Sequence, residues 1–336
     1  MGLEDINQND MQSMVYGFPI MLGAVTPSNS ATEAAVEASK EKKGGVCLLG
    51  MGGSAIAGEL CRGLLNELST IPLVCIRDYS IPHYVDSNWV VIAVSYSGNT
   101  EETISAFNQA KKRVCETYTI TSGGHLREIA DPTRLTILPG GFQPRAALPL
   151  ILSVELLLLE SIIGRARTNL LPLSTKLELL SQKWPIGVTP PDRFAKELQG
   201  TIPLFMSASH LEAVAYRAKC QINENSKIAS FYSTIPEANH NEIESIGWFS
   251  SMGVLPIFIR SEHENPRVSA RFNATSEIYE DEGAKPIHLW HPKNTKLEEL
   301  LIHTFYLDLV SVELAKLTGA DSVSVERITR LKKILS

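Results

Sequence analysis

The alternation of two kinds of segment constrains the fold of this 336-residue chain more than any other feature. Short apolar runs rich in β-branched residues, which predict strands, alternate with longer segments that have helical spacing. The expected strands are 46–49, 73–77, 90–95, 118–121 and 135–138, and the expected helices are 54–68, 100–114 and 126–130. This order predicts an α/β fold with a parallel sheet covered by helices on both faces. Ligand-binding groups are then expected at the carboxyl ends of the strands.

The same pattern restarts in the second half of the chain. Residues 166–200, where prolines and arginines interrupt the pattern, predict a linker that contains a short helix at 174–184. The expected elements after it are strands within 202–209, 227–234, 254–260 and 285–290 and helices at 210–226, 297–317 and 325–335. We therefore expect two α/β domains, residues 1–165 and 201–336, related by a weak internal repeat.

The composition excludes some classes of protein. An apolar content of 44% and a charged content of 20% are typical of a globular protein. The net charge of −6 gives no electrostatic footprint for a nucleic-acid partner. The apolar run 146–164 approaches the length of a membrane span, but Pro149, Glu155 and Glu160 interrupt it. We expect a helix buried between domains or subunits, and no membrane partner.

The cysteines and the N-terminus indicate the compartment. The five cysteines are odd in number, widely spaced and without a CxxC pair, so we interpret them as buried thiols of a reducing compartment. The first ten residues are acidic and polar, unlike a secretory signal. The expected location is the cytoplasm.

The loop after the first expected strand, GMGGSAIAGEL at 50–60, can approach a ligand closely. Gly50, Gly52 and Gly53 permit a tight turn, and Ser54 can cap the following helix. The start of a helix offers unpaired N–H groups and a partial positive charge, so an anion is stabilised there. An ordinary tight turn before a capped helix explains the same residues equally well.

A dinucleotide site is a further interpretation of this loop. Gly50, Gly52 and Ala55 fit the fingerprint G-x-G-x-x-G/A, and Asp78 ends the next expected strand. Asp78 lies beyond the usual spacing of about 20 residues. This alternative predicts a nicotinamide-dependent oxidoreductase.

The loop after the third expected strand, SYSGNT at 95–100, favours a phosphate ligand. Capping a helix requires one hydroxyl, whereas Ser95, Ser97 and Thr100 provide three within six residues, beside the flexible backbone of Gly98. The combination predicts an uncharged phosphate cradle. A dinucleotide fold does not need this second loop.

Five segments together carry a resemblance to a known family. MGGS at 51–54 and SYSGNTEET at 95–103 resemble the phosphosugar-binding pattern of SIS (sugar isomerase) domains. The segments PRAALP (144–149), YRAKCQINENSK (216–227) and PEANHNEIES (236–245) resemble the archaeal bifunctional phosphoglucose/phosphomannose isomerases.

The resemblance implies two SIS-type domains and a homodimer with shared active sites. It also implies a cofactor-independent isomerase of glucose, fructose and mannose 6-phosphates that works through ring opening and a cis-enediol. The implied phosphate-binding residues are Gly53, Ser54, Ser95, Tyr96, Ser97 and Thr100.

Glu224 is the candidate for the base of this isomerisation. It lies in an NEN segment at the end of an expected helix, where the negative end of the helix dipole raises the proton affinity of a carboxylate. A solvated glutamate at a helix end is the alternative. The resemblance implies that Glu224 moves the proton between C1 and C2.

His240 is the candidate for ring opening. Among the eight histidines it alone lies beside Glu237, Asn239 and Asn241, which could orient an imidazole. The resemblance implies that this histidine acts across the subunit interface.

Two basic residues complete the candidate site. Arg145 opens the apolar helix, where a buried cation needs a partner, and the resemblance places it beside the enediolate. Lys332 is one charge on a basic face of the last helix, and the resemblance implies that it assists ring opening.

Two further residues affect the expected specificity. Val325 stands where the family carries threonine, with Ser324 adjacent, so phosphomannose activity is less secure than phosphoglucose activity. No metal set is expected, since His288 and His291 have no carboxylates beside them. A non-catalytic phosphosugar sensor and the oxidoreductase remain as alternatives.

Overall fold

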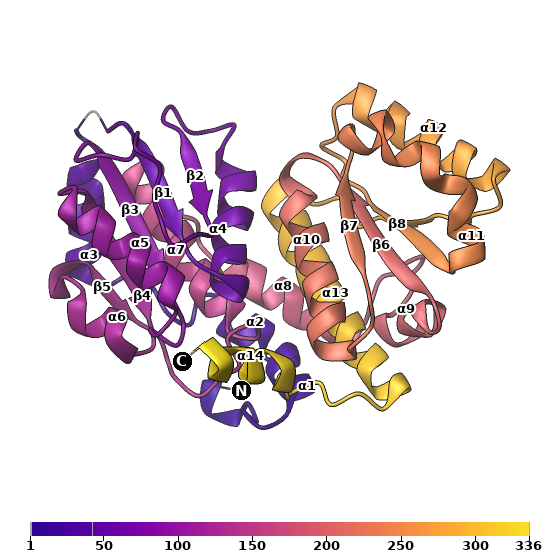
Figure 1. Cartoon of the computed structure of the whole chain (residues 1–336), viewed down its shortest axis with the longest axis horizontal. Helices are drawn as coiled ribbons and strands as arrows, with labels where there is room; N and C mark the ends of the chain where they lie inside the picture. Colours follow the sequence, from indigo (N-terminus) through magenta and orange to yellow (C-terminus); the bar gives the residue numbers. More distant parts are fainter. Residues whose placement is uncertain (1, 42, 336) are drawn as a thin grey trace. The chain divides into compact units, whose positions relative to one another are not determined.

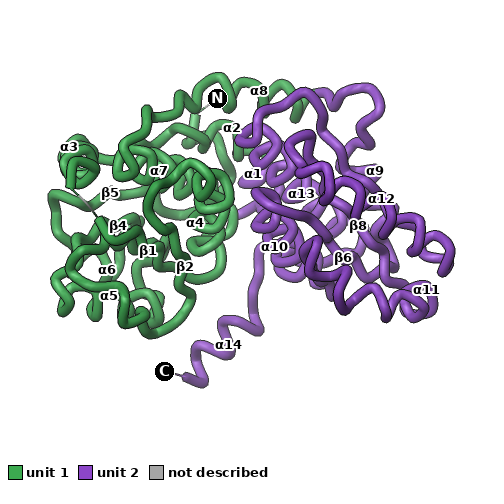
Figure 2. Tube along the Cα trace, turned by 90° about the horizontal axis from the view of Figure 1, so that it is seen from above, with its two compact units in different colours: residues 1–8, 16–182 green, residues 9–15, 183–336 purple. Residues whose placement is uncertain are grey.

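The computed structural model describes residues 2–41 and 43–335. This part of the chain divides into two compact units (Figure 2). Unit 1 comprises the residues up to Gln8 together with Tyr16–Gln182, and unit 2 comprises Asn9–Val15 and the residues from Lys183 onward. Each unit is built on a parallel sheet flanked by helices (Figure 1), as the alternating pattern predicts.

The sheet of unit 1 has five parallel strands in the order β2-β1-β3-β4-β5. The strands are β1 (Gly45–Leu49), β2 (Leu73–Ile76), β3 (Trp89–Val94), β4 (Glu116–Thr121) and β5 (Leu135–Ile137). The central strands β1 and β3 are buried along their whole length, as expected when helices cover both faces.

Helices cover both faces of this sheet. The long helices of unit 1 are α3 (Asn29–Ala38), α4 (Gly52–Leu65), α5 (Glu101–Lys112), α7 (Leu148–Ile162) and α8 (Leu171–Gln182), and the short ones are α2 (Phe18–Met21) and α6 (Gly124–Ile129). On one face, Val91 and Ala93 pack against Phe107 of α5 and Leu126 of α6. On the other, α4 packs against the sheet and α7, and every residue of α7 is buried. None of the helices in the described part is long and apolar enough to cross a membrane.

The sheet of unit 2 has four parallel strands in the order β7-β6-β8-β9. The strands are β6 (Ile202–Ser207), β7 (Phe231–Thr234), β8 (Val254–Ile259) and β9 (Ile287–Leu289). The helices are α9 (Pro191–Leu198), α10 (Glu212–Gln221), α11 (Phe249–Met252), α12 (Pro266–Asp281), α13 (Lys296–Thr318) and α14 (Glu326–Leu335). Phe272 and Tyr279 of α12 pack against Met206 and Phe258 on one face, and α10 and α13 pack together.

Three features differ from the expected elements. Residues 166–200, expected as a linker, contain two helices, of which α8 lies in unit 1 and α9 in unit 2. The 16-residue helix α12 was not expected. Most of α1 (Met11–Tyr16) lies in unit 2 although segments of unit 1 come before and after it in the chain, which no local pattern predicts.

Candidate active site

A hydrogen bond joins the two glycine- and serine-containing loops at the carboxyl edge of the first sheet. The backbone N–H of Tyr96, after β3, donates to the Ser54 hydroxyl, after β1, at 3.3 Å. Gly52 has a φ of 52°, in the left-handed region that glycine adopts at no cost. The two loops therefore face the same point, where α4 begins at the exposed Gly52 and the half-buried Gly53.

The loop after β3 is organised by its hydroxyl groups. The Ser95 and Thr100 hydroxyls lie 2.9 Å apart, and the Gly98 N–H donates to the Ser95 hydroxyl at 3.1 Å. Thr100 is the N-cap of α5, yet its side chain caps no backbone N–H. The Thr100 hydroxyl is turned toward Ser95 instead. This arrangement is expected of a phosphate-binding loop and not of a simple helix N-cap. Ser97 is exposed beside them.

Tyr96 has a structural task in this loop. Its hydroxyl donates to the Pro139 carbonyl at 2.7 Å and accepts from the Phe142 N–H at 3.2 Å. Burial raises the pKa of Tyr96, and the bond from Phe142 opposes that rise. The Tyr96 hydroxyl thus links the loop after β3 to the segment that leads to Arg145. The predicted contact between Tyr96 and phosphate stays a prediction.

Arg145 lies directly beside the first loop. A Cβ at Gly53 would stand 3.0 Å from the Pro144 carbonyl oxygen and 3.1 Å from the Arg145 Cα, so any other residue would push this backbone away. Arg145 is 5% exposed. It occupies a turn, because α7 begins only at Leu148 rather than at Arg145. Unit 1 therefore gathers the six predicted phosphate ligands and the predicted cation at one sheet edge.

Glu224 of unit 2 lies in a π-helical turn, η4 (Ile222–Ser226), directly after α10. The neighbouring side chains anchor this turn on α13: Asn225 donates to the Ser311 hydroxyl at 2.9 Å, and Ser226 donates to the Ser311 carbonyl at 2.7 Å. Glu224 itself is half-buried. Single π turns occur frequently at functional sites, because the extra residue re-aims a side chain.

Lys227 is a residue that the sequence did not single out. It ends the π turn with a φ of 60°, and its ammonium donates to the Glu224 carbonyl at 2.5 Å and the Ser324 carbonyl at 2.7 Å. It therefore links the turn that carries Glu224 to the segment that contains Val325. An unusual backbone conformation of lysine leaves no signal in a single sequence.

His240 ends a short 3₁₀ turn, η5 (Glu237–His240), and is exposed. The polar neighbours expected to orient its ring have other partners. Asn239 donates to the Thr275 hydroxyl at 2.7 Å, and Asn241 donates to the Glu237 carboxylate at 3.1 Å. Within the described residues, the imidazole of His240 has no hydrogen-bond partner.

Lys332 lies on α14, a helix with no buried residue that stands away from the second sheet (Figure 2). All sides of this helix are accessible to solvent. Its apolar side chains Ile328, Leu331 and Ile334 are exposed as well. Unit 2 therefore places Glu224 beside residues 324–325. His240 and Lys332 are exposed on other segments of unit 2.

The two histidines considered as metal ligands serve other contacts. His288 Nδ1 lies 3.1 Å from the Arg260 guanidinium, and its Nε2 lies 3.0 Å from the Ser276 hydroxyl. His291 packs its ring on His303, with centroids 4.5 Å apart. Among residues 2–41 and 43–335, no group of three or more His, Cys, Asp or Glu side chains is placed to hold a metal ion.

Comparison with known proteins identifies the family. Residues 40–131 match the SIS domain, and residues 188–335 match the bacterial phospho-glucose isomerase C-terminal SIS domain. A bifunctional phosphoglucose/phosphomannose isomerase of Aquifex aeolicus is 37% identical over 87% of this chain and 90% of its own length. A D-glucosamine-6-phosphate 4-epimerase of Sulfolobus acidocaldarius is 35% identical over 68% of this chain and 72% of its own.

A solved structure has the same fold at low identity. Tagatose-6-phosphate ketose/aldose isomerase from Escherichia coli superposes with a TM-score of 0.71 and 15% identity, over 93% of this chain and 95% of that one. On the extent and identity of the match to the Aquifex aeolicus relative, together with the two domain matches, this chain belongs to the bifunctional phosphoglucose/phosphomannose isomerase family.

Proposed function

We propose that the chain is a sugar-phosphate isomerase that interconverts glucose 6-phosphate and fructose 6-phosphate, and mannose 6-phosphate and fructose 6-phosphate. The family supports this activity directly. The observation that carries it in the structure is the convergence on Gly53: this residue touches the backbone beside Arg145, and the adjacent Ser54 is bonded to the loop after β3. The meeting of three segments far apart in the sequence at a single sheet edge supports the proposal.

The phosphate of the substrate is bound by uncharged groups in this proposal. The hydroxyls of Ser54, Ser95, Ser97 and Thr100 and the N–H groups at the start of α4 are its donors. A helix N-terminus stabilises an anion through its orphan N–H groups and its dipole. The exposed hydroxyl of Ser97 is the donor most available to an incoming ligand.

Glu224 transfers the proton once the sugar ring is open. It removes the C2 proton of the aldose, the C2 electron pair forms the C1–C2 double bond, and the carbonyl oxygen at C1 takes up a proton. The same carboxyl group returns the proton to C1, and the C2 hydroxyl loses its proton to become the ketone oxygen, which balances the proton that the C1 oxygen took up. One carbon is oxidised and its neighbour reduced, so the balance needs no cofactor. Arg145 stabilises the negative oxygen of the enediolate.

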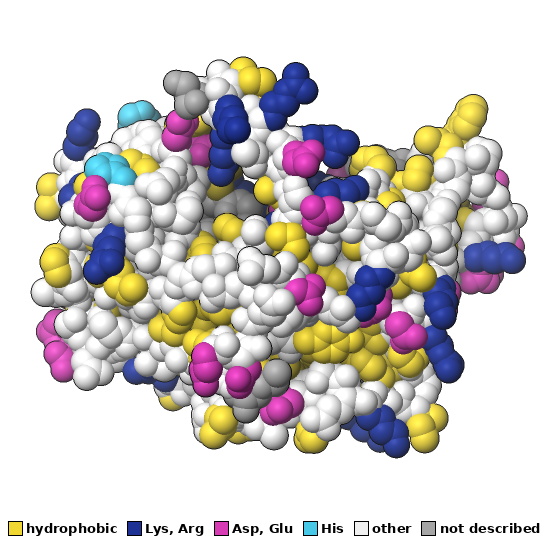
Figure 3. All heavy atoms as spheres, turned by 90° about the horizontal axis from the view of Figure 1, so that it is seen from below, with side chains coloured by type: hydrophobic (Ala, Val, Ile, Leu, Met, Phe, Trp, Pro, Cys, Tyr) yellow, Lys and Arg dark blue, Asp and Glu magenta, His cyan; other side chains and the backbone are white. Residues whose placement is uncertain are grey.

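His240 and Lys332 open the ring in this scheme, and His240 acts in the site of a partner chain. The exposure of His240 and the open apolar side chains of α14 support a homodimer with shared sites. Apolar side chains also gather at the surface on the face drawn in Figure 3. The five cysteines are free thiols, three buried and two half-buried, which supports a reducing compartment, the cytoplasm.

A coupled assay tests the activity. Purified protein with fructose 6-phosphate and no added nucleotide should form glucose 6-phosphate, and mannose 6-phosphate should also be consumed. Glu224→Gln should lower kcat by about 10²- to 10⁴-fold, as expected for loss of an acid–base group. Glu277→Gln, an exposed position on α12, is the matched control and should retain activity.

Three outcomes would redirect the proposal. Binding of sugar phosphates without turnover, unchanged by Glu224→Gln, would identify a phosphosugar sensor. Turnover of glucosamine 6-phosphate in preference to the hexose phosphates would favour an epimerase like the Sulfolobus acidocaldarius relative. Fluorescence change with a nicotinamide dinucleotide, together with turnover that depends on it, would favour the oxidoreductase.

A further inference from the structure

The two sheets repeat one backbone turn after corresponding strands. Leu49 is the last residue of β1 paired with β3, and Met206 is the last residue of β6 paired with β8. The third residue after each is Gly52, with a φ of 52°, and Ser209, with a φ of 55°. Both lie in the left-handed region, which non-glycine residues rarely adopt. The loop after β6 is therefore the structural counterpart of the loop after β1.

The loops after β3 and β8 correspond in the same way. Ser95 follows β3 and donates its N–H to a carbonyl of the next strand at 3.2 Å, and Arg260 follows β8 and does the same at 2.9 Å. Counting onward from Gly52 and Ser209, and from Ser95 and Arg260, gives the corresponding residues of the two units that could contact a ligand. The pairs are Gly53 with His210, Tyr96 with Ser261, and Ser97 with Glu262.

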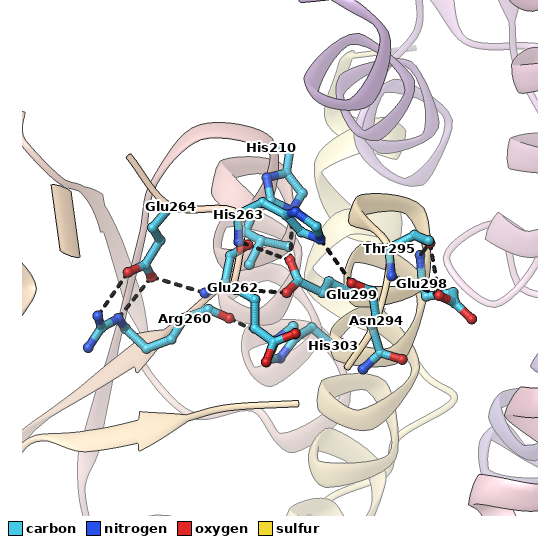
Figure 4. Close-up of polar contacts among 12 residues, drawn as sticks. His210, Arg260, Glu262, His263, Glu264, Asn294, Thr295, Glu298, Glu299 and His303 are labelled. Carbon is cyan, nitrogen blue, oxygen red and sulfur yellow. Dashed lines mark hydrogen bonds and ion pairs between the residues drawn. The ribbon is translucent and has the colours of Figure 1, made fainter. Parts of the chain in front are cut away.

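In unit 2, the loops after β6 and β8 form an anion-binding nest of donor groups. This nest already holds a carboxylate of the chain itself (Figure 4). The Glu299 carboxylate accepts from the Ser261 hydroxyl at 2.5 Å and from the Glu262 backbone N–H at 2.9 Å. His210 Nε2 lies 3.1 Å from the same carboxylate. Glu299 is 1% exposed, so these three donors replace its water. Charge-assisted bonds of this kind are the strong ones in proteins.

The surroundings keep this carboxylate charged. Burial raises the pKa of Glu299, but the hydrogen bonds from His210, Ser261 and Glu262 together lower it by more than burial raises it. The pKa of Glu299 therefore lies below its usual value. The nearby Glu264 is neutralised by the Arg260 guanidinium in two bonds of 2.8 Å. Glu264 also accepts from the Ser261 backbone N–H at 2.9 Å. With Glu264 paired to Arg260, the charge that the nest holds is that of Glu299.

The charge at the corresponding place in unit 1 is inverted. There Gly53 touches the backbone of Arg145, in the turn before α7. In unit 2, His210 contacts Glu299, in the first turn of α13. Helices α7 and α13 each pack on the helix that follows the first central strand, α4 in unit 1 and α10 in unit 2. Unit 1 thus places an arginine backbone beside its loop, and unit 2 inserts a carboxylate of its own between the corresponding loops.

We propose that the second unit retains the anion-binding nest of the repeated motif and that Glu299 closes it by occupying the place of a ligand anion. Each chain then offers a substrate phosphate one nest only, in unit 1. The nest recognises a carboxylate group, and removing the Glu299 side chain opens it to a small free carboxylate. The place of the substrate phosphate in unit 1 rests on the proposed function, whereas the closure of the unit 2 nest by Glu299 does not.

Chemical rescue tests the proposal. Glu299→Ala leaves the three donors without an acceptor and should lower the Tm by on the order of 10 °C. Acetate matches the lost methylene and carboxylate, so about 0.1 M acetate should restore at least half of the lost Tm by binding the folded state. Glu299→Gln fills the same space without a charge and is the matched control, which should be destabilised but not rescued.

An uncharged ligand and a comparison of the two variants serve as further controls. Acetamide, an uncharged isostere, should rescue Glu299→Ala far less than acetate, and equal rescue would overturn the claim that the nest selects an anion. Acetate that stabilises Glu299→Ala no more than Glu299→Gln would also overturn it. If the alanine variant does not fold, wild-type crystals soaked in inorganic phosphate decide. Phosphate is expected at the unit 1 loops alone, and phosphate bound by Ser261 and His210 contradicts the proposal.

Discussion

Ser95 and Ser97 stand two residues apart in one loop, but their hydroxyls have different surroundings. Ser95 is 1% exposed and bonded to Thr100 and Gly98. Ser97 is exposed, and in the described part of the chain its hydroxyl accepts only a long bond of 3.3 Å, from the Asn99 N–H. Ser97→Ala should therefore raise KM for fructose 6-phosphate about tenfold with little change in Tm, since a bond to a charged ligand is lost.

The matched variant separates binding from folding. Ser95→Ala should raise KM and also lower the free energy of unfolding by about 1 kcal/mol, because the Thr100 hydroxyl loses its partner and the buried Gly98 N–H keeps only its bond to the Ser95 carbonyl. Equilibrium urea unfolding and initial rates on the same preparations measure both quantities. A Ser97→Ala variant with unchanged KM would remove Ser97 from the phosphate site.

Lys227 offers a second prediction for a single residue, as a positioning group. Lys227→Met removes the ammonium that joins the Glu224 and Ser324 carbonyls, while an unbranched apolar side chain of similar length to the lysine stem remains. We expect kcat to fall about tenfold with KM little changed, since the loss disturbs the alignment of Glu224 rather than phosphate binding. The ratio of mannose to glucose 6-phosphate turnover should change as well, because residues 324–325 lose the same anchor.

An exposed lysine of unit 2 provides the control for this change. Lys285→Met lies before β9 and should leave kcat and the turnover ratio as they are. Equal effects of the two substitutions, or a loss in Lys227→Met that follows its Tm alone, would contradict a positioning role.

The candidate site could be read from the sequence only where its chemistry is local. SYSGNT at 95–100 and the glycines at 50–53 predict a cradle because hydroxyls and flexible backbone occur in a single short loop. The contact between Gly53 and Arg145 joins residues 92 positions apart, and the closing of the second nest by Glu299 joins α13 to loops far earlier in the chain. Such contacts depend on tertiary packing, which one sequence does not reveal. The polar neighbours of His240 were predicted to orient it, but each has a better partner nearby.

At the scale of elements, periodicity located the central strands because burial on both faces gives them continuous apolar runs. The expected strand 90–95 and β3 (Trp89–Val94) differ by one residue at each end. Helix α12 was missed although its start carries a signal: Asn265 caps the helix and Pro266 follows at the first helical position. Its buried side chains, at Phe272, Thr275, Ser276 and Tyr279, form a stripe half of which is polar, so hydrophobic spacing alone is weak.

Helix α7 carries two buried glutamates that differ in their partners. Burial, with a further contribution from the charge of Glu59, raises the pKa of Glu155 well above its usual value, and its Oε2 has no hydrogen-bond partner in the described part. Glu160 accepts from the Thr168 N–H and hydroxyl at 2.7 and 2.5 Å. Glu155→Met should therefore stabilise unit 1 by on the order of 1 kcal/mol, and Glu160→Met should destabilise it.

The pH dependence of Glu155→Met follows from the direction of the shift. A carboxyl whose folded pKa is raised holds its proton in the folded state, while the unfolded chain releases it above about pH 4.3. The unfolding free energy contributed by Glu155 therefore falls as pH rises, so the gain from methionine should be larger at pH 8 than at pH 4.5. Urea unfolding at the two pH values measures it, and a gain that is larger in acid would mean that Glu155 is ionised in the folded protein.

For the whole molecule, the question is which chain supplies each catalytic group. Glu224 is half-buried and anchored within unit 2 through α13, whereas His240 is exposed and has no hydrogen-bond partner in the described residues. In a symmetric dimer each chain gives what it receives, so a site shared in this way occurs twice. If each site takes Glu224 from one chain and His240 from the other, the variants Glu224→Gln and His240→Ala should complement each other.

Mixing these two variants measures the sharing. If His240 acts in the partner's site, a mixed dimer has one site with both groups intact and one with neither. Random exchange makes about half of the dimers mixed, so activity should return to about a quarter of the wild-type value. Denaturation and refolding of the mixture, beside each variant alone, provides the exchange. If both groups of a site come from one chain, every site in the mixture lacks one of them, and the mixture should stay as inactive as its parts.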